Sequence, residues 1–200
     1  MQLGKTPALW HDALGIVAAL IGNSKQNVRV LDFGGAVGSG YVQLLGALPK
    51  NIKIDYHVVE LDNMCSVGRE LFNDYYDIKF HSGIPAMDGK IDVIYINGAL
   101  QYMSDYKAFL SSVCHTGASY ILFGRLPAGD VPTYATEQLN LRNVTLPYWI
   151  LNLGEFTNIL GSNGYRLIFE GFSDQEFDQD NFPVTHRLGR FRTLLFAQSS

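Results

Sequence analysis

A glycine-rich turn behind a short apolar run is the first stretch of this sequence that could bind a ligand. In VLDFGGAVGSGY, residues 30–41, Asp32 precedes four glycines. Glycines let the backbone adopt positive φ and approach a ligand closely, and a helix that begins there presents free N–H groups. These features suit a nucleotide-like ligand. The carboxylate of Asp32 could equally stabilise the turn through local hydrogen bonds.

The spacing of the glycines separates two classes of such ligand. No register of the four supplies the G-x-G-x-x-G of a dinucleotide site, which disfavours a nicotinamide-dependent oxidoreductase. The stretch instead reads D-x-G-x-A-x-G from Asp32 to Gly38, with Ala36 in place of one of the alternate glycines. Because a methyl group is a small intrusion beside the backbone, we expect the turn to keep its function.

The apolar pattern on either side predicts the elements that position this turn. Strands are expected at 27–33, 54–60, 78–81, 90–97 and 118–125, with helices at 38–48, 64–73 and about 106–113. A first amphipathic helix contains Trp10, Leu14, Val17 and Ile21 at helical spacing. Short apolar strands alternating with helices predict a parallel, doubly wound sheet with right-handed crossovers. Ligands bind such sheets at the carboxyl ends of the strands, which is where the turn lies.

The last third departs from this alternation. Residues 126–150 are rich in proline and are expected to form a long ordered loop on the substrate side, with room for one helical turn. A helix follows at 152–160, with Asn152 as its cap and Glu155 at the capping-box position.

Two final strands, at 165–172 and 189–198, have no helix between them and should pair antiparallel. The predicted fold class is therefore α/β, with a doubly wound, mostly parallel seven-stranded sheet and an antiparallel C-terminal hairpin. We expect residues 1–200 to form a single domain, with residues 1–27 as an N-terminal helical cap.

Composition excludes several classes of function. The chain has 200 residues, of which 47% are hydrophobic and 17% charged, as in globular domains. Its net charge of -4 does not favour a nucleic-acid partner. The apolar run at 13–22 is too short to span a bilayer, and His11 and Asp12 precede it where a signal peptide would carry basic residues.

The two cysteines also bear on where the protein acts. Cys65 and Cys114 have no paired spacing, which favours two buried free thiols in a reducing compartment and a cytoplasmic location. The adjacent pair Cys114 and His115 lacks partners at metal-ligand spacing, so no metal site is expected.

The motifs together resemble class I S-adenosylmethionine-dependent methyltransferases. Their first motif is an acidic residue followed by G-x-G-x-G, and the fourth is similar to DVIYINGALQYMSDY at 92–106. FHSG at 80–83 stands where a loop lines the adenine, and the resemblance extends over about 28–198. It implies S-adenosylmethionine as cofactor. The cofactor contacts that it implies are Asp32, Phe33, Gly34, Gly35, Gly38, Glu60, Leu61, His81, Ser82, Asn97, Gly98 and Gln101.

In that family, an acidic residue at the end of the second strand binds the ribose hydroxyls. Glu60, the last residue of HVVE, is similar in position, and a carboxylate suits two hydroxyls because it only accepts hydrogen bonds. Asp62 follows in the same loop, so either carboxylate could take this role. Glu60 could also be a solvated strand end.

A narrower resemblance concerns the acceptor of the methyl group. LDFGGAVGSGY, VVELDNM, YATEQ and PYWI are similar to segments of methyltransferases encoded among bacterial surface-polysaccharide genes. This resemblance implies polysaccharide biosynthesis and a sugar or glycan acceptor. NGAL at 97–100 departs from the N-P-P-Y of amino-group methyltransferases, which argues against nucleic-acid bases and glutamine as acceptors.

An oxygen acceptor usually requires a base within hydrogen-bond reach. We expect transfer to oxygen, with His186 as the first candidate base because the loop before the last strand should reach the ligand edge. Arg125 could bind an anionic acceptor or could equally be an exposed structural arginine. Gln101 and Tyr102 stand where many small-molecule methyltransferases have a sequence similar to L-H-H, and either residue could contact the acceptor or only support the loop. A non-catalytic scaffold of the same fold remains the alternative, and a homodimer is left open.

Overall fold

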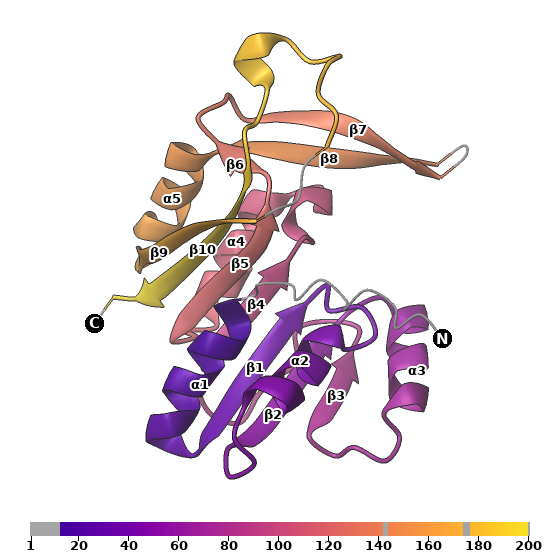
Figure 1. Ribbon diagram of the computed structural model, residues 1–200, viewed down its shortest axis with the longest axis vertical. Coiled ribbons are helices and arrows are strands. Elements are labelled where there is room, and N and C mark those ends of the chain that lie inside the picture. The colour runs from indigo at the N-terminus through magenta and orange to yellow at the C-terminus, as the bar shows by residue number, and fades with distance from the viewer. Residues whose placement is uncertain (1–12, 142–143, 174–176, 200) are drawn as a thin grey trace, which may run out of the picture.

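The computed structural model describes residues 13–141, 144–173 and 177–199 of the chain, so Trp10 and the start of the expected N-terminal cap lie outside it. Figure 1 shows a central sheet with helices on both faces and a smaller sheet above it. The seven strands follow the order β3-β2-β1-β4-β5-β10-β9. Their bounds are β1 (Asn27–Phe33), β2 (Lys53–Val59), β3 (Ile78–His81), β4 (Val93–Asn97), β5 (Tyr120–Leu126), β9 (Tyr165–Ser173) and β10 (Phe191–Gln198).

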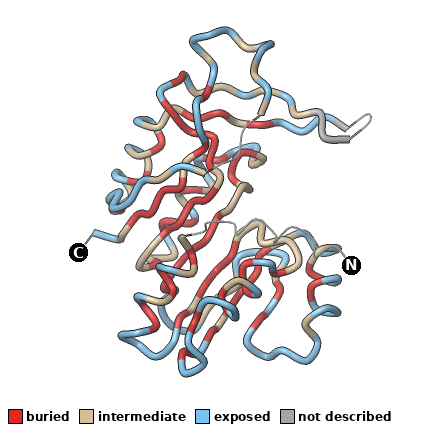
Figure 2. The backbone as a smooth tube through the Cα atoms, in the orientation of Figure 1, coloured by how far each residue is buried: buried red, intermediate tan, exposed pale blue. Residues whose placement is uncertain are grey.

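The predicted sheet is confirmed in both its parallel and its antiparallel part. β1 pairs in parallel with β2 and β4, and β4 with β5. β10 runs antiparallel to both β5 and β9, because no helix separates β9 from β10 and the chain must return directly. The residues of β1, β4 and β5 are largely buried, as expected of parallel strands covered on both faces (Figure 2).

The helices divide between the two faces of the sheet. The helices α1 (Ala13–Lys25), α2 (Ser39–Ala47) and α3 (Asp62–Leu71) bury residues such as Leu14, Leu44 and Cys65 against one face. The helices α4 (Tyr106–His115) and α5 (Leu153–Ser162) bury Leu110 and Phe156 against the other. Both cysteines are buried free thiols, as predicted.

One part of the second face is covered by no helix of the described residues. β3 passes to β4 through residues 82–92, which contain no helix or strand. On that face the first three strands carry Arg29, Asp55 and Lys79, and Asp55 accepts hydrogen bonds from both basic side chains. A face that no helix covers stays in contact with water, so charged residues replace the apolar residues found elsewhere on the sheet.

Most of residues 126–141 and 144–150 lie in strands, so the predicted long ordered loop is wrong. A small sheet of order β6-β8-β7 contains β6 (Ala128–Gly129), β7 (Tyr134–Leu141) and β8 (Val144–Asn152). The prolines misled the prediction because Pro147 lies where β8 pairs only with β7, while β6 pairs only with Leu151 and Asn152. A proline is tolerated where the other edge of a strand is unpaired.

The predicted cap at the start of α5 is confirmed at Asn152, but Glu155 has a different partner from the one predicted. The side chain of Asn152 accepts a hydrogen bond from the Glu155 N–H at 2.9 Å, as expected. The carboxylate of Glu155 does not complete a capping box, however, and instead accepts a hydrogen bond from Thr133. The Asn152 N–H donates to the Thr133 hydroxyl at 2.9 Å, so this threonine connects the two ends of the expected box.

Candidate cofactor and acceptor site

The glycine turn lies where the strand order of the sheet reverses. β1 leads into the turn, and its neighbour β4 leads into a second turn that begins at Gly98. A Cβ added to Gly34 would lie 2.4 Å from the Cβ of Ala99, so the two turns touch. In doubly wound sheets, ligands bind at the carboxyl ends of the strands beside such a reversal. The candidate site is therefore this edge of the sheet.

Asp32 supports the turn from within the protein. Its side chain is buried, and its Oδ2 accepts a hydrogen bond from the Tyr56 hydroxyl at 2.7 Å. A Cβ at Gly35 would lie 2.3 Å from Asp32 Oδ2, and one at Gly40 would lie 2.1 Å from the Tyr56 oxygen. These contacts favour the supporting role that the sequence left open for Asp32. A direct contact with a cofactor stays a prediction.

The backbone of the turn has positive φ at three alternate positions. The φ values are 71° at Gly34, 49° at Ala36 and 94° at Gly38, which caps α2. Glycine adopts this region freely, whereas an alanine with its Cβ is disfavoured there. Ala36 therefore keeps the conformation of the alternate-glycine pattern under some backbone strain. The turn brings the N-terminus of α2 to the candidate site.

The next strand end contributes Glu60, which is partly buried. Its Oε2 accepts a hydrogen bond from the Leu61 N–H at 2.6 Å, and its own N–H donates to the His81 carbonyl oxygen. Leu61 is 70% exposed, and Ser82 is exposed as well. A carboxylate, an exposed leucine and an exposed hydroxyl thus lie along the edge next to the glycine turn. Phe33 packs on Phe109, with ring centroids 4.3 Å apart.

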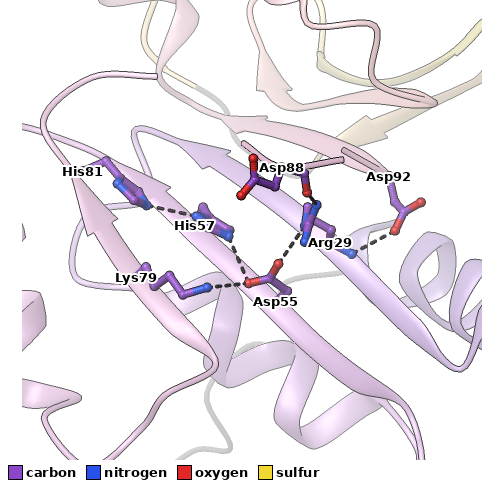
Figure 3. Close-up of polar contacts among 7 residues, drawn as sticks. All are labelled: Arg29, Asp55, His57, Lys79, His81, Asp88 and Asp92. Atoms are coloured by element: carbon purple, nitrogen blue, oxygen red, sulfur yellow. Dashed lines mark hydrogen bonds and ion pairs between the residues drawn. The ribbon is translucent and has the colours of Figure 1, made fainter. Parts of the chain in front are cut away.

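The side chain of His81 belongs to a polar network on the face without a helix. Figure 3 shows His81 directed toward His57, which in turn contacts Asp55. His57 Nε2 lies 3.0 Å from Asp55 Oδ1, and His57 Nδ1 lies 3.0 Å from His81 Nε2. Because the carboxylate accepts the Nε2 proton of His57, His57 Nδ1 must accept from His81 Nε2–H. An adenine contact by His81 stays a prediction.

Charges around this network set its ionisation. Burial lowers the pKa of both histidines and the charge of Lys79 lowers both further, while the charge of Asp55 acts in the opposite direction on the pKa of His57 without cancelling the decrease. Burial would raise the pKa of Asp55, but hydrogen bonds from Lys79 and Arg29 lower it to about 2. Asp55 is thus a carboxylate and both imidazoles are neutral at pH 7.

At the end of β4, Arg125 lies across Asn97. The Arg125 Nε–H donates to Asn97 Oδ1 at 2.9 Å, and Nη2 lies 3.5 Å from the Asn97 carbonyl oxygen. Arg125 has φ of 46°, a conformation that residues with a Cβ rarely adopt. Glycines make room on both sides: a Cβ at Gly124 would lie 2.7 Å from Asn97 Oδ1, and one at Gly98 3.3 Å from Arg125 Nε.

The second turn also brings Gln101 and Tyr102 under the small sheet. Both belong to the short helix η1 (Leu100–Tyr102), which contacts β8. The Tyr102 hydroxyl donates to Gln138 Oε1 at 2.7 Å, and its ring meets Tyr148 edge-on. Gln101 is buried and forms a hydrogen bond with the Tyr148 hydroxyl. Its Oε1 has no hydrogen-bond partner among the described residues.

Tyr148 is the residue of this group that the sequence did not suggest. Burial raises its pKa and the nearby Tyr102 raises it further, while the hydrogen bond from Gln101 and the charge of Arg125 act in the opposite direction. Tyr148 is therefore a neutral hydroxyl that can donate but does not act as a base at pH 7. The aromatic pair in PYWI, residues 147–150, was the signal that could have found it.

The described contacts of His186 are with Tyr134 and Thr185, and none is with these residues. Its carbonyl oxygen accepts from the Tyr134 hydroxyl at 2.6 Å, its ring packs on Tyr134, and its Nδ1 lies 3.0 Å from the Thr185 hydroxyl. The loop that carries it, yellow at the top of Figure 1, lies beyond β7 and β8 from the end of β1. The structure thus brings together Arg125, Asn97, Gln101, Tyr102 and Tyr148, without a described contact to His186.

Comparison with known proteins identifies the fold. No protein-family model matches the sequence, and no curated protein matches it significantly. The structure of magnesium protoporphyrin IX methyltransferase from Synechocystis PCC 6803 with bound SAH has a TM-score of 0.60 at 17% identity, covering 92% of this chain and 80% of that chain. The structure of 1,6-didemethyltoxoflavin-N1-methyltransferase from Burkholderia thailandensis with bound S-adenosylhomocysteine has a TM-score of 0.60 at 13% identity. The match covers 95% of this chain and 80% of that chain. The structure of mitomycin 7-O-methyltransferase has a TM-score of 0.61 at 17% identity, and the match covers 94% of this chain and 53% of that chain.

This chain has the fold of class I methyltransferases. In this methyltransferase fold the glycine turn, Glu60 and the Asn97 turn follow three adjacent strands, β1, β2 and β4. The small sheet of residues 128–152 stands over the third of these turns. Within the part of the chain that the structure describes, no cluster of metal-ligating side chains occurs, and no helix is long and apolar enough to cross a bilayer.

Proposed function

We propose that this protein is an S-adenosylmethionine-dependent methyltransferase. The observation that carries the proposal is the contact between Gly34 and Ala99, because it joins the glycine turn to the turn after β4 at the point where the strand order reverses. Neighbouring structures of the same fold were solved with SAH or SAM bound. The resemblance of the sequence motifs to the same family supports the proposal independently.

The residues at this edge fit such a cofactor. Positive φ at Gly34, Ala36 and Gly38 curves the backbone into a cradle in front of the N-terminus of α2. Gly35 and the turn at Asn97 and Gly98 border the same cradle. When bound, the cofactor supplies a methyl group already activated on a sulfonium.

Glu60 would accept hydrogen bonds from the ribose hydroxyls, since its partly exposed carboxylate lies at the end of β2. Leu61 and Ser82 would cover the adenine. The 70% exposure of Leu61 supports this assignment, because a bound ring would remove this apolar surface from water.

The acceptor would lie between the turn after β4 and the small sheet. Arg125, Gln101, Tyr102 and Tyr148 are the polar groups there, and they can hold an acceptor in line with the methyl group. We propose a small molecule or glycan acceptor that is methylated on oxygen. The neighbours' names include both a 7-O- and an N1-methyltransferase of small molecules. The polysaccharide connection, the cytoplasmic location and a homodimer stay predictions from the sequence.

Calorimetry with SAH and NAD tests the cofactor. We expect SAH to bind with a well-defined stoichiometry and NAD not to bind. NAD binding without SAH binding would overturn the proposal. If SAH binds but no acceptor is ever methylated, the non-catalytic scaffold becomes the better description; His186, the sequence's candidate base, has no described contact with the acceptor residues.

A further inference from the structure

We propose that Arg125 binds a carboxylate of the acceptor and that the methyl group is transferred to an oxygen of that carboxylate, giving a methyl ester. This inference rests on the proposed function and deepens it by naming the acceptor class. It follows from how Arg125 is held, from which groups surround it, and from the proton balance of the reaction.

The backbone of Arg125 has a strained conformation, and its side chain is held by Asn97. Its φ of 46° is unfavourable for a residue with a Cβ, and such conformations cluster at functional sites. Gly124 and Gly98 leave the space into which Asn97 and the guanidinium fit. Asn97 then holds the guanidinium through Nε, over the turn that follows β4. The partly exposed cation is thereby directed along the ligand edge of the sheet.

A guanidinium in this position suits an anionic oxygen acceptor. Its N–H groups form a planar fork that matches a carboxylate, and such charge-assisted hydrogen bonds are short and strong. Tyr148 lies close enough for the charge of Arg125 to act on its hydroxyl. That hydroxyl already accepts from Gln101 and can donate its own hydrogen to the same carboxylate.

The reaction then needs no base. A carboxylate oxygen forms a bond to the methyl carbon while the carbon–sulfur bond breaks, and the electron pair of that bond goes to the sulfur. The anion and the sulfonium become a neutral ester and a neutral thioether, so no proton moves. A hydroxyl acceptor would have to lose a proton. Among the described residues, the groups that act on the ionisation of Tyr148 are Tyr102, Gln101 and Arg125, none of which is a base at neutral pH.

Gln101 indicates a second feature of the acceptor. Its Oε1 is buried and has no partner among the described residues, while its amide group faces the Tyr148 hydroxyl. A buried carbonyl without a hydrogen bond is unfavourable, and a ligand hydroxyl would satisfy it. An acceptor with a hydroxyl beside its carboxylate fits both groups. We therefore infer a hydroxy acid of the sugar-acid kind.

Binding is tested with D-glucuronate and D-galacturonate, against D-glucose and D-galactose as neutral counterparts, by saturation-transfer NMR on the SAH-loaded protein. We expect the two acids to bind and the two sugars not to bind. Arg125→Asn should weaken acid binding at least tenfold, since asparagine tolerates positive φ but carries no charge. Arg125→Lys should keep part of the affinity. Arg166→Gln should change nothing, because this exposed arginine lies at the start of β9, beside the start of β5 and at the opposite edge of the sheet.

The product is tested with isotopically labelled S-adenosylmethionine and the same acids. A methyl ester releases labelled methanol at about pH 11, whereas a methyl ether does not. The rate should be nearly flat between pH 6 and 9, because no base takes part. An alkali-stable product, a rate that rises through this range, or binding of neither acid to the SAH-loaded protein would overturn the inference and leave the proposed function standing. Failure of SAH to bind would overturn both.

Discussion

The hydroxyl of Tyr56 donates a 2.7 Å hydrogen bond to Oδ2 of Asp32, directly behind the glycine turn. Both side chains are buried, and together they occupy the space that a Cβ at Gly35 or Gly40 would need. Two of the four glycines in the motif are thus explained by packing inside the protein. The other two, Gly34 and Gly38, have positive φ, and a Cβ there would meet Ala99 and Ile78, respectively.

Two glycines of α2 give a matched test of this packing. Gly40→Ala would place a Cβ 2.1 Å from the Tyr56 oxygen, so we expect a loss of about 1–3 kcal/mol in the free energy of unfolding, together with weaker SAH binding. Gly46→Ala in the same helix meets no atom within 4 Å and should gain roughly 0.5–1 kcal/mol from helix propensity. Urea denaturation measures both. If Gly40→Ala leaves the free energy of unfolding unchanged, Asp32 and Tyr56 can move aside.

Ala36 should be a site where glycine is the better residue. Its φ of 49° disfavours a residue with a Cβ by about 1–2 kcal/mol, and the larger chain entropy of glycine offsets part of that. We expect Ala36→Gly to raise the free energy of unfolding by about 0.5–1 kcal/mol. Ala108→Gly, an exposed position within α4, should lower it by a similar amount. Urea denaturation measures both variants. If both change the free energy of unfolding in the same direction, the turn is not strained at Ala36.

Glu60 and Asp62 can be separated by their effect on the cofactor. Glu60→Ala should weaken SAH binding by roughly 1–3 kcal/mol, since the ribose hydroxyls would lose their acceptor. Asp62→Ala should have little effect, because Asp62 is an exposed residue at the start of α3. Calorimetry on both variants decides the matter. A larger loss for Asp62→Ala would assign the ribose contact to that residue.

Sequence patterns predicted the parts of the fold that depend on apolar runs. The parallel strands are short and largely apolar, and the absence of a helix before the last strand required an antiparallel hairpin. The strands of residues 134–152 were missed because prolines usually end strands, and only the pairing shows that Pro147 faces an unpaired edge. Local patterns do not contain that information.

The candidate site was predictable only where it follows directly from a strand end. Gly34, Glu60 and Asn97 come immediately after β1, β2 and β4, so topology alone places them on one edge. Tyr148 reaches the site through the small sheet, which the sequence did not predict. His186 was assigned to the ligand edge because its loop precedes the last strand. Its carbonyl oxygen accepts a hydrogen bond from Tyr134, and its role as a base stays a prediction.

The paired histidines predict a dependence of stability on pH. Burial and the charge of Lys79 lower the pKa of His57 and His81, so the unfolded chain, with histidine pKa values of about 6.5, binds more protons than the folded one as pH falls. Their contribution is complete above about pH 7 and is lost as pH falls below about 6.5 toward the lowered folded-state values. Thermal unfolding at pH 7.5 and 5.5 measures this difference.

His57→Gln should reduce the difference in thermal stability between pH 7.5 and pH 5.5, because glutamine does not titrate. His115→Gln, at an exposed position near the end of α4, should leave it in place. An unchanged difference in His57→Gln would assign the pH dependence to other groups. The carboxylate of Asp55 acts in a separate range: its pKa of about 2 means that its contribution is lost only as pH falls from about 4 toward 2.

His186→Ala distinguishes the base suggested by the sequence from the reaction inferred from the structure. If His186 removes a proton from the acceptor, turnover should fall by about 10²–10⁴-fold while SAH affinity is unchanged. We expect turnover on an acid acceptor to stay within about threefold, because a carboxylate has no proton to lose and the ring of His186 packs on Tyr134. Tyr134→Phe is the control, since it removes only the hydrogen bond to the His186 carbonyl. A large loss in His186→Ala but not in Tyr134→Phe would restore His186 as the base and remove the ester reaction.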